Sequence, residues 1–285
     1  MRTLAAALMC VSIITTSDLL AQGGGRGRFR RAEEITNRVG AFFSDIAGPT
    51  TDGDKVADLA TVELVRAATS SNQLAVLYLV DQSDDEDVRG QFERQLFASD
   101  EIGIELRCFH CGRIDLAKEK QLKDRYAKKA PLFVVYDAKG KETEVPMSGY
   151  KASASSLQKA IEKAATGTIK PPIAAFAKQY GGIVRDLEQL LNKKKMASEK
   201  AAKAGDDKQK RAEAEKDIAD LEAEQKKLLD EENELLGKMK LPERAADAKR
   251  LGGFNGFGGG GGGGGGRGNG GKGGGGGNGG GGNGG

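Results

Sequence analysis

The sequence predicts an α/β fold, in which a mixed sheet flanked by helices is followed by an antiparallel helical hairpin and a Gly-rich tail. Two short apolar runs predict the sheet, LAVLYLVD at residues 74–81 and LFVVYD at residues 132–137, and helical sequence separates them. A nearly unbroken apolar run of this length is typical of a strand buried on both faces. Buried strands that alternate with helical segments indicate an α/β sheet.

Length and charge limit the classes of function. The chain has 285 residues, 38% of them hydrophobic and 5% aromatic, which suits one domain of ordinary size with additions. The 44 basic and 41 acidic side chains leave a formal charge of +3, and this balance gives no reason to expect a nucleic-acid partner. Of the 43 glycines, 26 lie in the last 35 residues, so the average composition describes the folded part poorly.

The first 21 residues have the pattern of a secretory signal peptide. Arg2 precedes an apolar stretch over residues 4–15, and Asp18 interrupts the apolar sequence before Ala21. The stretch is too short to span a membrane. We therefore expect cleavage after Ala21 and an exported protein, periplasmic or extracellular, with no stable membrane span once the signal is removed. Export places the remaining cysteines in an oxidising compartment.

Residues 22–56 are predicted to form a basic linker and a short helix. The segment GGGRGRFRR at residues 23–31 has linker composition. Apolar side chains then recur at helical spacing over residues 32–47, which predicts a one-sided helix that ends before Pro49. These side chains are Ile35, Val39, Phe42, Phe43 and Ile46.

Residues 57–167 are predicted to form the sheet domain. The acidic residues after Ser83 favour a helix start with Ser83 as its N-cap, because a helix N-terminus attracts negative charge. Alternation of Ile102, Ile104 and Leu106 predicts a strand, and Asp137 opens a turn into a return strand. The expected elements are helix 59–69, strand 74–81, the helix after Ser83, strand 102–106, helix 116–129, strand 132–137, strand 141–150 and helix 153–165.

Over residues 60–165 this order resembles the thioredoxin-like family. The resemblance depends on the central strand 74–81, on Ala130-Pro131 directly before LFVVYD, on the DAKGK turn and on the return strand that contains Gly149. In that family the proline is cis and lines a peptide-binding surface. The resemblance therefore implies a cis bond between Ala130 and Pro131 and a peptide-binding role for Pro131.

The chain departs from the family where the family's chemistry lies. Active members carry Cys-x-x-Cys just after the central strand, at a helix start that lowers the pKa of the first thiol. Here the matching residues 81–86 read DQSDDE. They contain no sulfur, and their carboxylates would raise the pKa of a neighbouring thiol.

A different pair, Cys108 and Cys111, is predicted to lie at the end of the second strand, facing the same rim as the proline loop. Three interpretations stay open: a disulfide, two ordinary free thiols, or a metal site with His110, the only histidine. An extended chain would separate the two Cα atoms by about 10 Å, whereas a disulfide needs less than about 7 Å. The metal interpretation lacks a fourth ligand, and no cofactor is indicated.

Residues 168–248 are predicted to form a helical hairpin, or coiled coil. Apolar residues recur at steps of three and four over 173–190 and again over 218–239, although Gln225 and Glu232 interrupt the second stripe. Each arm is about 45 Å long. Residues 249–285 are predicted to be a disordered Gly-rich tail, because they bury too little apolar surface to offset the entropy of ordering.

These observations favour a binding or scaffold protein of the cell envelope without the usual redox nucleophile. We expect a protein or peptide partner, and the hairpin offers a surface for self-association. The alternative is a thiol–disulfide oxidoreductase in cell redox homeostasis that uses Cys108 and Cys111 as catalytic residues. Other enzyme classes are hard to support, because one histidine beside two cysteines makes no Ser/His/Asp triad and the Gly tail has no phosphate-loop context.

Overall fold

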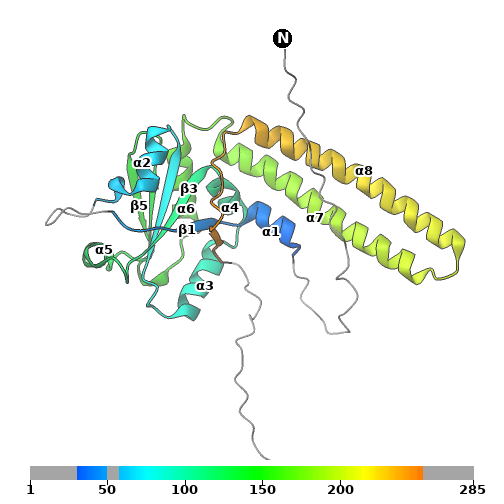
Figure 1. Ribbon diagram of the computed structural model, residues 1–285, viewed down its shortest axis with the longest axis horizontal. Helices are drawn as coiled ribbons and strands as arrows, with labels where there is room; N and C mark the ends of the chain where they lie inside the picture. The colour runs from blue at the N-terminus through cyan, green and yellow to red at the C-terminus, as the bar shows by residue number, and fades with distance from the viewer. Residues whose placement is uncertain (1–30, 50–57, 253–285) are drawn as a thin grey trace, which may run out of the picture.

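The computed structural model describes residues 31–49 and 58–252 and shows a mixed sheet with helices on both faces (Figure 1). The strand order is β5-β4-β2-β3-β1-β6. The central strands β1, β2 and β3 are parallel, whereas β4, β5 and β6 each pair antiparallel with a neighbour. The strands are β1 Phe42–Asp45, β2 Leu74–Val80, β3 Phe109–Asp115, β4 Leu132–Tyr136, β5 Glu142–Pro146 and β6 Lys249–Arg250.

The two predicted apolar runs form the middle of this sheet, as expected. All seven residues of β2 and all five of β4 are buried. Because side chains alternate across a strand, Val76 and Tyr78 enter one core cluster while Leu77 and Leu79 enter the other. The Tyr78 and Phe133 rings stack with their centroids 4.6 Å apart. Burial on both faces explains why these strands carry no polar alternation.

Helices cover the sheet unequally. One face packs against α2 and α5, and the other, larger cluster joins the sheet to α1, α3, α4, α6 and the first half of α7. The helices are α1 Glu33–Val39, α2 Glu63–Ser70, α3 Glu86–Leu96, α4 Asp100–Leu106, α5 Lys120–Tyr126, α6 Ala154–Ala165, α7 Ile173–Lys203 and α8 Lys208–Lys238, with short 3₁₀ turns η1 Leu59–Thr61 and η2 Ser148–Tyr150.

The strand predicted over residues 102–106 is wrong, because this segment is helix α4. Ser99 caps it by accepting a hydrogen bond from the Glu101 N–H at 3.2 Å. The last five residues of the helix, including Gly103 and Glu105, are all buried. A helix covered on every side has no polar face, so its apolar residues do not reveal a helical period.

The single helix predicted over residues 32–47 is also wrong in its second half. Helix α1 ends at Val39, Gly40 is extended, and β1 follows at Phe42. Ser44 and Asp45 pair in parallel with Gly112 and Arg113 of β3. This long-range pairing overrides the helical spacing of the apolar residues.

Other local predictions hold in outline. The Ala130–Pro131 bond is cis, as the resemblance implied. The cap of α3 is Asp85, whose carboxylate accepts from the N–H groups of Asp87 and Val88, and Ser83 instead bonds to Asp81. The helix predicted over 116–129 is shortened to α5, and the return strand to β5.

The predicted hairpin is confirmed, and its base belongs to the fold. Helices α7 and α8 lie side by side, and their distal halves extend away from the sheet (Figure 1). The two residues that interrupt the apolar stripe of α8 have specific partners: Glu232 binds Arg38 and Tyr180, and Gln225 accepts from Lys194 at 2.9 Å.

The chain returns from α8 to the sheet through β6. Lys249 and Arg250, which the sequence assigned to the tail, pair antiparallel with β1. The Leu251 N–H donates to the Ala41 carbonyl at 2.9 Å. Residues 253–285 of the predicted tail, the signal peptide 1–21 and most of the basic linker lie outside the described residues. Among the described helices, none is long and apolar enough to cross a membrane.

Candidate functional site

The rim at the end of β2 carries carboxylates where a thioredoxin-like enzyme would carry its thiols. Asp81 forms an ion pair with Lys123 at 2.6 Å and accepts from Ser83. The hydrogen bond from Lys123, followed by those from Ser83, lowers the pKa of Asp81. Asp85 caps α3. The helix start is therefore occupied by its own acidic side chains, which suit no thiolate chemistry.

Pro131 lies at this same rim, since Leu132 pairs with Leu79 near the end of β2. It is buried, and its carbonyl accepts a hydrogen bond from the Met147 N–H at 2.7 Å. Tyr150 approaches the helix start from η2, and its hydroxyl donates to Asp84 at 2.5 Å. Pro131, the predicted peptide-binding residue, thus lies beside the acidic helix start, and its carbonyl is already hydrogen-bonded to Met147.

The two cysteines lie at the opposite end of the sheet, and the expectation that they share the proline rim is wrong. Cys108 directly precedes β3, and Cys111 is the third residue of that strand. Phe109 pairs with Leu74 at the beginning of β2, so the pair opens the strand instead of ending it. The expected position was wrong because residues 102–106, predicted to be a strand that ends before the cysteines, form helix α4, and the strand begins after it.

Both thiols are free in the structure. Burial raises the pKa of Cys108 to about 12 and also raises the pKa of Cys111. The Cys111 sulfur lies 3.5 Å from the carbonyl oxygens of Leu106 and Phe109. Neither thiol is therefore activated as a nucleophile at neutral pH.

His110 does not complete a metal site. Its Nε2 is 2.6 Å from the Gln73 side-chain oxygen, and burial lowers its pKa. Residues 31–49 and 58–252 contain no group of three or more His, Cys, Asp or Glu side chains arranged to hold a metal ion.

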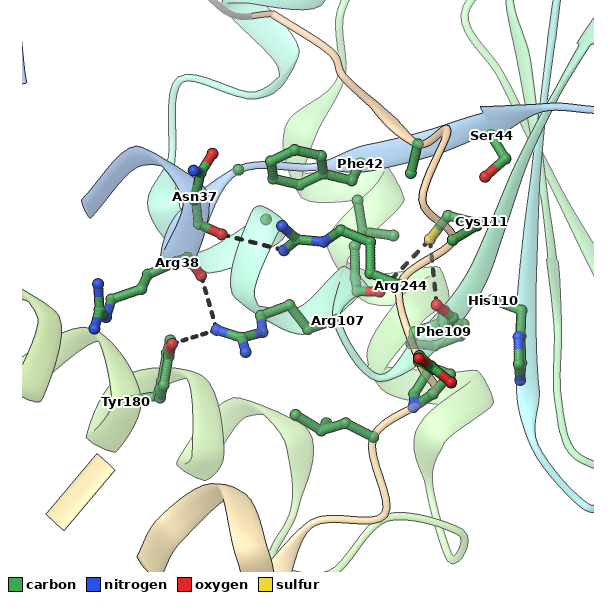
Figure 2. A pocket seen from close by; sticks show the side chains of 18 of the residues that line it. Asn37, Arg38, Phe42, Ser44, Arg107, Phe109, His110, Cys111, Tyr180 and Arg244 are labelled. Atoms are coloured by element: carbon green, nitrogen blue, oxygen red, sulfur yellow. Dashed lines mark hydrogen bonds between the residues drawn. The ribbon is translucent and has the colours of Figure 1, made fainter. Parts of the chain in front are cut away.

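A cavity that the sequence did not predict opens beside Cys111, with a volume of about 570 Å³ (Figure 2). Its walls come from the end of α1, the turn between α4 and β3, helix α7, and the segment after α8. Three of its side chains are arginines: Arg38, Arg107 and Arg244. No local motif marks them, because they come from segments up to about 200 residues apart.

One of these arginines is neutralised inside the wall. The Nε of Arg38 donates to both carboxylate oxygens of Glu232, at 2.9 and 3.1 Å, and Tyr180 donates to Glu232 at 2.8 Å. Burial lowers the pKa of Arg38, but the hydrogen bond and charge of Glu232 outweigh burial and raise it. Burial is the main cause that raises the pKa of Tyr180 to about 12. This triad ties α1 to both arms of the hairpin.

Comparisons of the chain with protein-family models, with curated proteins and with solved structures give no match.

Proposed function

We propose that this chain is an exported, thioredoxin-like protein that binds another protein and performs no thiol chemistry. The observation that carries this proposal is the acidic helix start after β2. Asp81, Asp84 and Asp85 occupy it, while at the far end of the sheet Cys108 is buried and Cys111 half-buried, both with raised pKa values. A fold of this type without an activated sulfur retains its surfaces for binding.

The projecting half of the hairpin is the surface best placed for a partner. Its cross-contacts, such as Lys194 with Gln225 and Glu222, join the two arms to each other. Near its end Met196 is 63% exposed, and it lines a shallow groove of about 340 Å³ with Leu221. Methionine is enriched at protein–protein interfaces relative to the rest of the surface.

The hairpin is held rigidly enough to act as an arm. The base of α7 contributes Phe176, Tyr180 and Leu187 to the main core, all of them at most 2% exposed. The ion pair of Arg31 with Glu188 at 2.8 Å adds a further link to the region around α1. A partner bound near Met196 would therefore be held at a defined distance from the sheet.

The binding proposal is tested by site-specific photo-crosslinking in cells that produce the protein. A photoreactive phenylalanine analogue at Met196 should yield a discrete crosslinked protein, whereas the same analogue at Lys139, exposed at the β4–β5 turn, should not. Equal crosslinking at both positions, or none at Met196, would contradict a specific hairpin partner.

The absence of thiol chemistry is tested by reduction of insulin disulfides. The purified protein should show no turnover above the background of the added dithiol, and Cys108→Ser and Cys111→Ser variants should behave like the parent. Turnover that depends on either cysteine would reject the proposal in favour of an oxidoreductase. Export is tested separately by mass spectrometry, with a mature chain beginning at Gln22 as the expected product.

A further inference from the structure

The cavity beside Cys111 contains two guanidinium groups that no carboxylate neutralises. Arg107 and Arg244 form no ion pair with any residue in the described part of the chain. Figure 2 shows both groups pointing in the same direction, toward the end of α1 and Tyr180. Arg107 is half-buried, and Arg244 belongs to the exposed segment between α8 and β6.

Each guanidinium uses only part of its donor capacity. Arg107 donates through Nη1 to the Arg38 carbonyl and to the Tyr180 hydroxyl. Arg244 donates through Nη2 to the Asn37 carbonyl at 3.1 Å. The bonds to Asn37 and Arg38 satisfy carbonyls in the last turn of α1, where a helix attracts positive charge.

The remaining donors form a polar face with no protein acceptor. The Nε and Nη2 groups of Arg107, and the Nε and Nη1 groups of Arg244, donate to no described residue. The Nε and Nη2 groups of Arg107 lie on one edge of its guanidinium, where they match the two oxygens of a carboxylate or phosphate, whereas the Nε and Nη1 groups of Arg244 would each donate singly.

The surrounding charges favour an anion between the two arginines. Glu232 is committed to Arg38, and Glu34 lies 4.0 Å from Arg38. Glu243, the remaining lining carboxylate, is exposed. Burial, followed by the nearby charge of Arg107, lowers the pKa of Arg244, as expected of two like charges held close together without a counter-ion.

We propose that this cavity binds a small organic anion, whose carboxylate or phosphate group is held by Arg107 and Arg244. Its volume of about 570 Å³ suits a small metabolite. Apolar walls contributed by Phe42, Leu106 and Phe109 would cover the body of such a molecule. The Arg244 guanidinium lies 3.6 Å from the centre of the Phe42 ring, which holds the cation at the cavity wall. This site is independent of the hairpin surface.

The test is isothermal titration calorimetry at low ionic strength with two probes, inorganic phosphate and succinate. Arg244→Gln is the informative variant, because Arg244 lies on an exposed segment and its loss should leave the fold intact. Arg185→Gln is the matched control, since it removes one exposed positive charge from α7 outside the cavity. Circular dichroism checks that both variants fold.

We expect at least one probe to bind, and Arg244→Gln to weaken that binding by about tenfold or more, because a hydrogen bond to a charged group is lost. Arg185→Gln should bind like the parent. Binding of phosphate alone or of succinate alone would identify which oxyanion the site prefers and supports the proposal. Absence of binding by both probes, or equal weakening by both variants, would overturn it.

Discussion

Glu105 is a buried carboxylate whose charge should make the stability of the protein depend on pH. It lies in the last turn of α4 with 0% exposure. Gln158 of α6 donates to its Oε1 at 3.1 Å, whereas its Oε2 has no hydrogen-bond partner among the described residues. Burial, with smaller contributions from the charges of Glu162 and Glu101, raises its pKa to about 7.

The sign of the effect follows from the raised pKa. Between the ordinary pKa of 4.5 and the folded value of about 7, the folded chain holds a proton that the unfolded chain has lost. Raising the pH through this window therefore removes stability. At about 1.4 kcal/mol for each unit of pKa, the loss is at most about 3.5 kcal/mol.

Glu105→Gln removes the ionisable group and keeps an acceptor for Gln158. We expect the variant to be more stable than the parent at about pH 8, by at most about 3.5 kcal/mol, and by less than about 1 kcal/mol at about pH 5. The measurement is urea unfolding followed by circular dichroism at both pH values. Taking the difference between the two proteins cancels the titration of other groups. Glu63→Gln is the control, because Glu63 is exposed on α2, which covers the opposite face of the sheet.

The result that refutes this reasoning is a free-energy difference of equal size at both pH values, or a variant less stable than the parent at about pH 8. Either outcome would mean that the Glu105 carboxylate is adequately solvated. A carboxyl carbon NMR titration of Glu105 provides a direct check, since a midpoint near 4.5, the ordinary value, would refute the raised pKa.

Two further predictions concern packing and the thiols. A Cβ at position 103 would lie 1.8 Å from the Val39 carbonyl oxygen, so Gly103→Ala should destabilise the fold by about 3 kcal/mol or more in urea unfolding. A Cβ at position 182 would have no neighbouring atom within 4 Å, so Gly182→Ala should instead stabilise α7 by about 0.5–1 kcal/mol. Equal effects of the two substitutions would contradict this account. Both Cys108 and Cys111 should react with iodoacetamide at least about a hundredfold more slowly than an unperturbed thiol, because burial raises their pKa values. Fast alkylation of the native protein, at the rate seen in urea, would contradict the raised pKa values of the two thiols.

The middle of the sheet and the hairpin were predictable because each is governed by its own local pattern. Strand β2 is apolar throughout since both its faces are covered, and α7 repeats its apolar residues at coiled-coil spacing. The acidic first turn of α3 was predictable in the same way, although the N-cap is Asp85 and the prediction of Ser83 was wrong.

The elements that were predicted wrongly depend on contacts distant in sequence. Strand β3, FHCGRID, has little strand character and is a strand because β2 and β1 pair with its two edges. Helix α4 has no polar face because α1, α6 and α7 surround it, and Gly103 allows the Val39 carbonyl to approach. Because helix α4 was predicted to be a strand, Cys108 and Cys111 were expected at the wrong end of the sheet.

By itself, the sequence determined that the helix after the central strand begins with carboxylates and no sulfur, and that a long hairpin follows the sheet domain. Both properties are local, since helix caps and apolar periods depend on residues within a few turns of each other. Only the tertiary structure decided that Cys108 is buried, that Cys111 is half-buried, and that Arg107 and Arg244 meet in one cavity. The end of α1, the turn before β3 and the segment after α8 form this site, and only the packing of the hairpin base and the pairing of β6 with β1 bring them together.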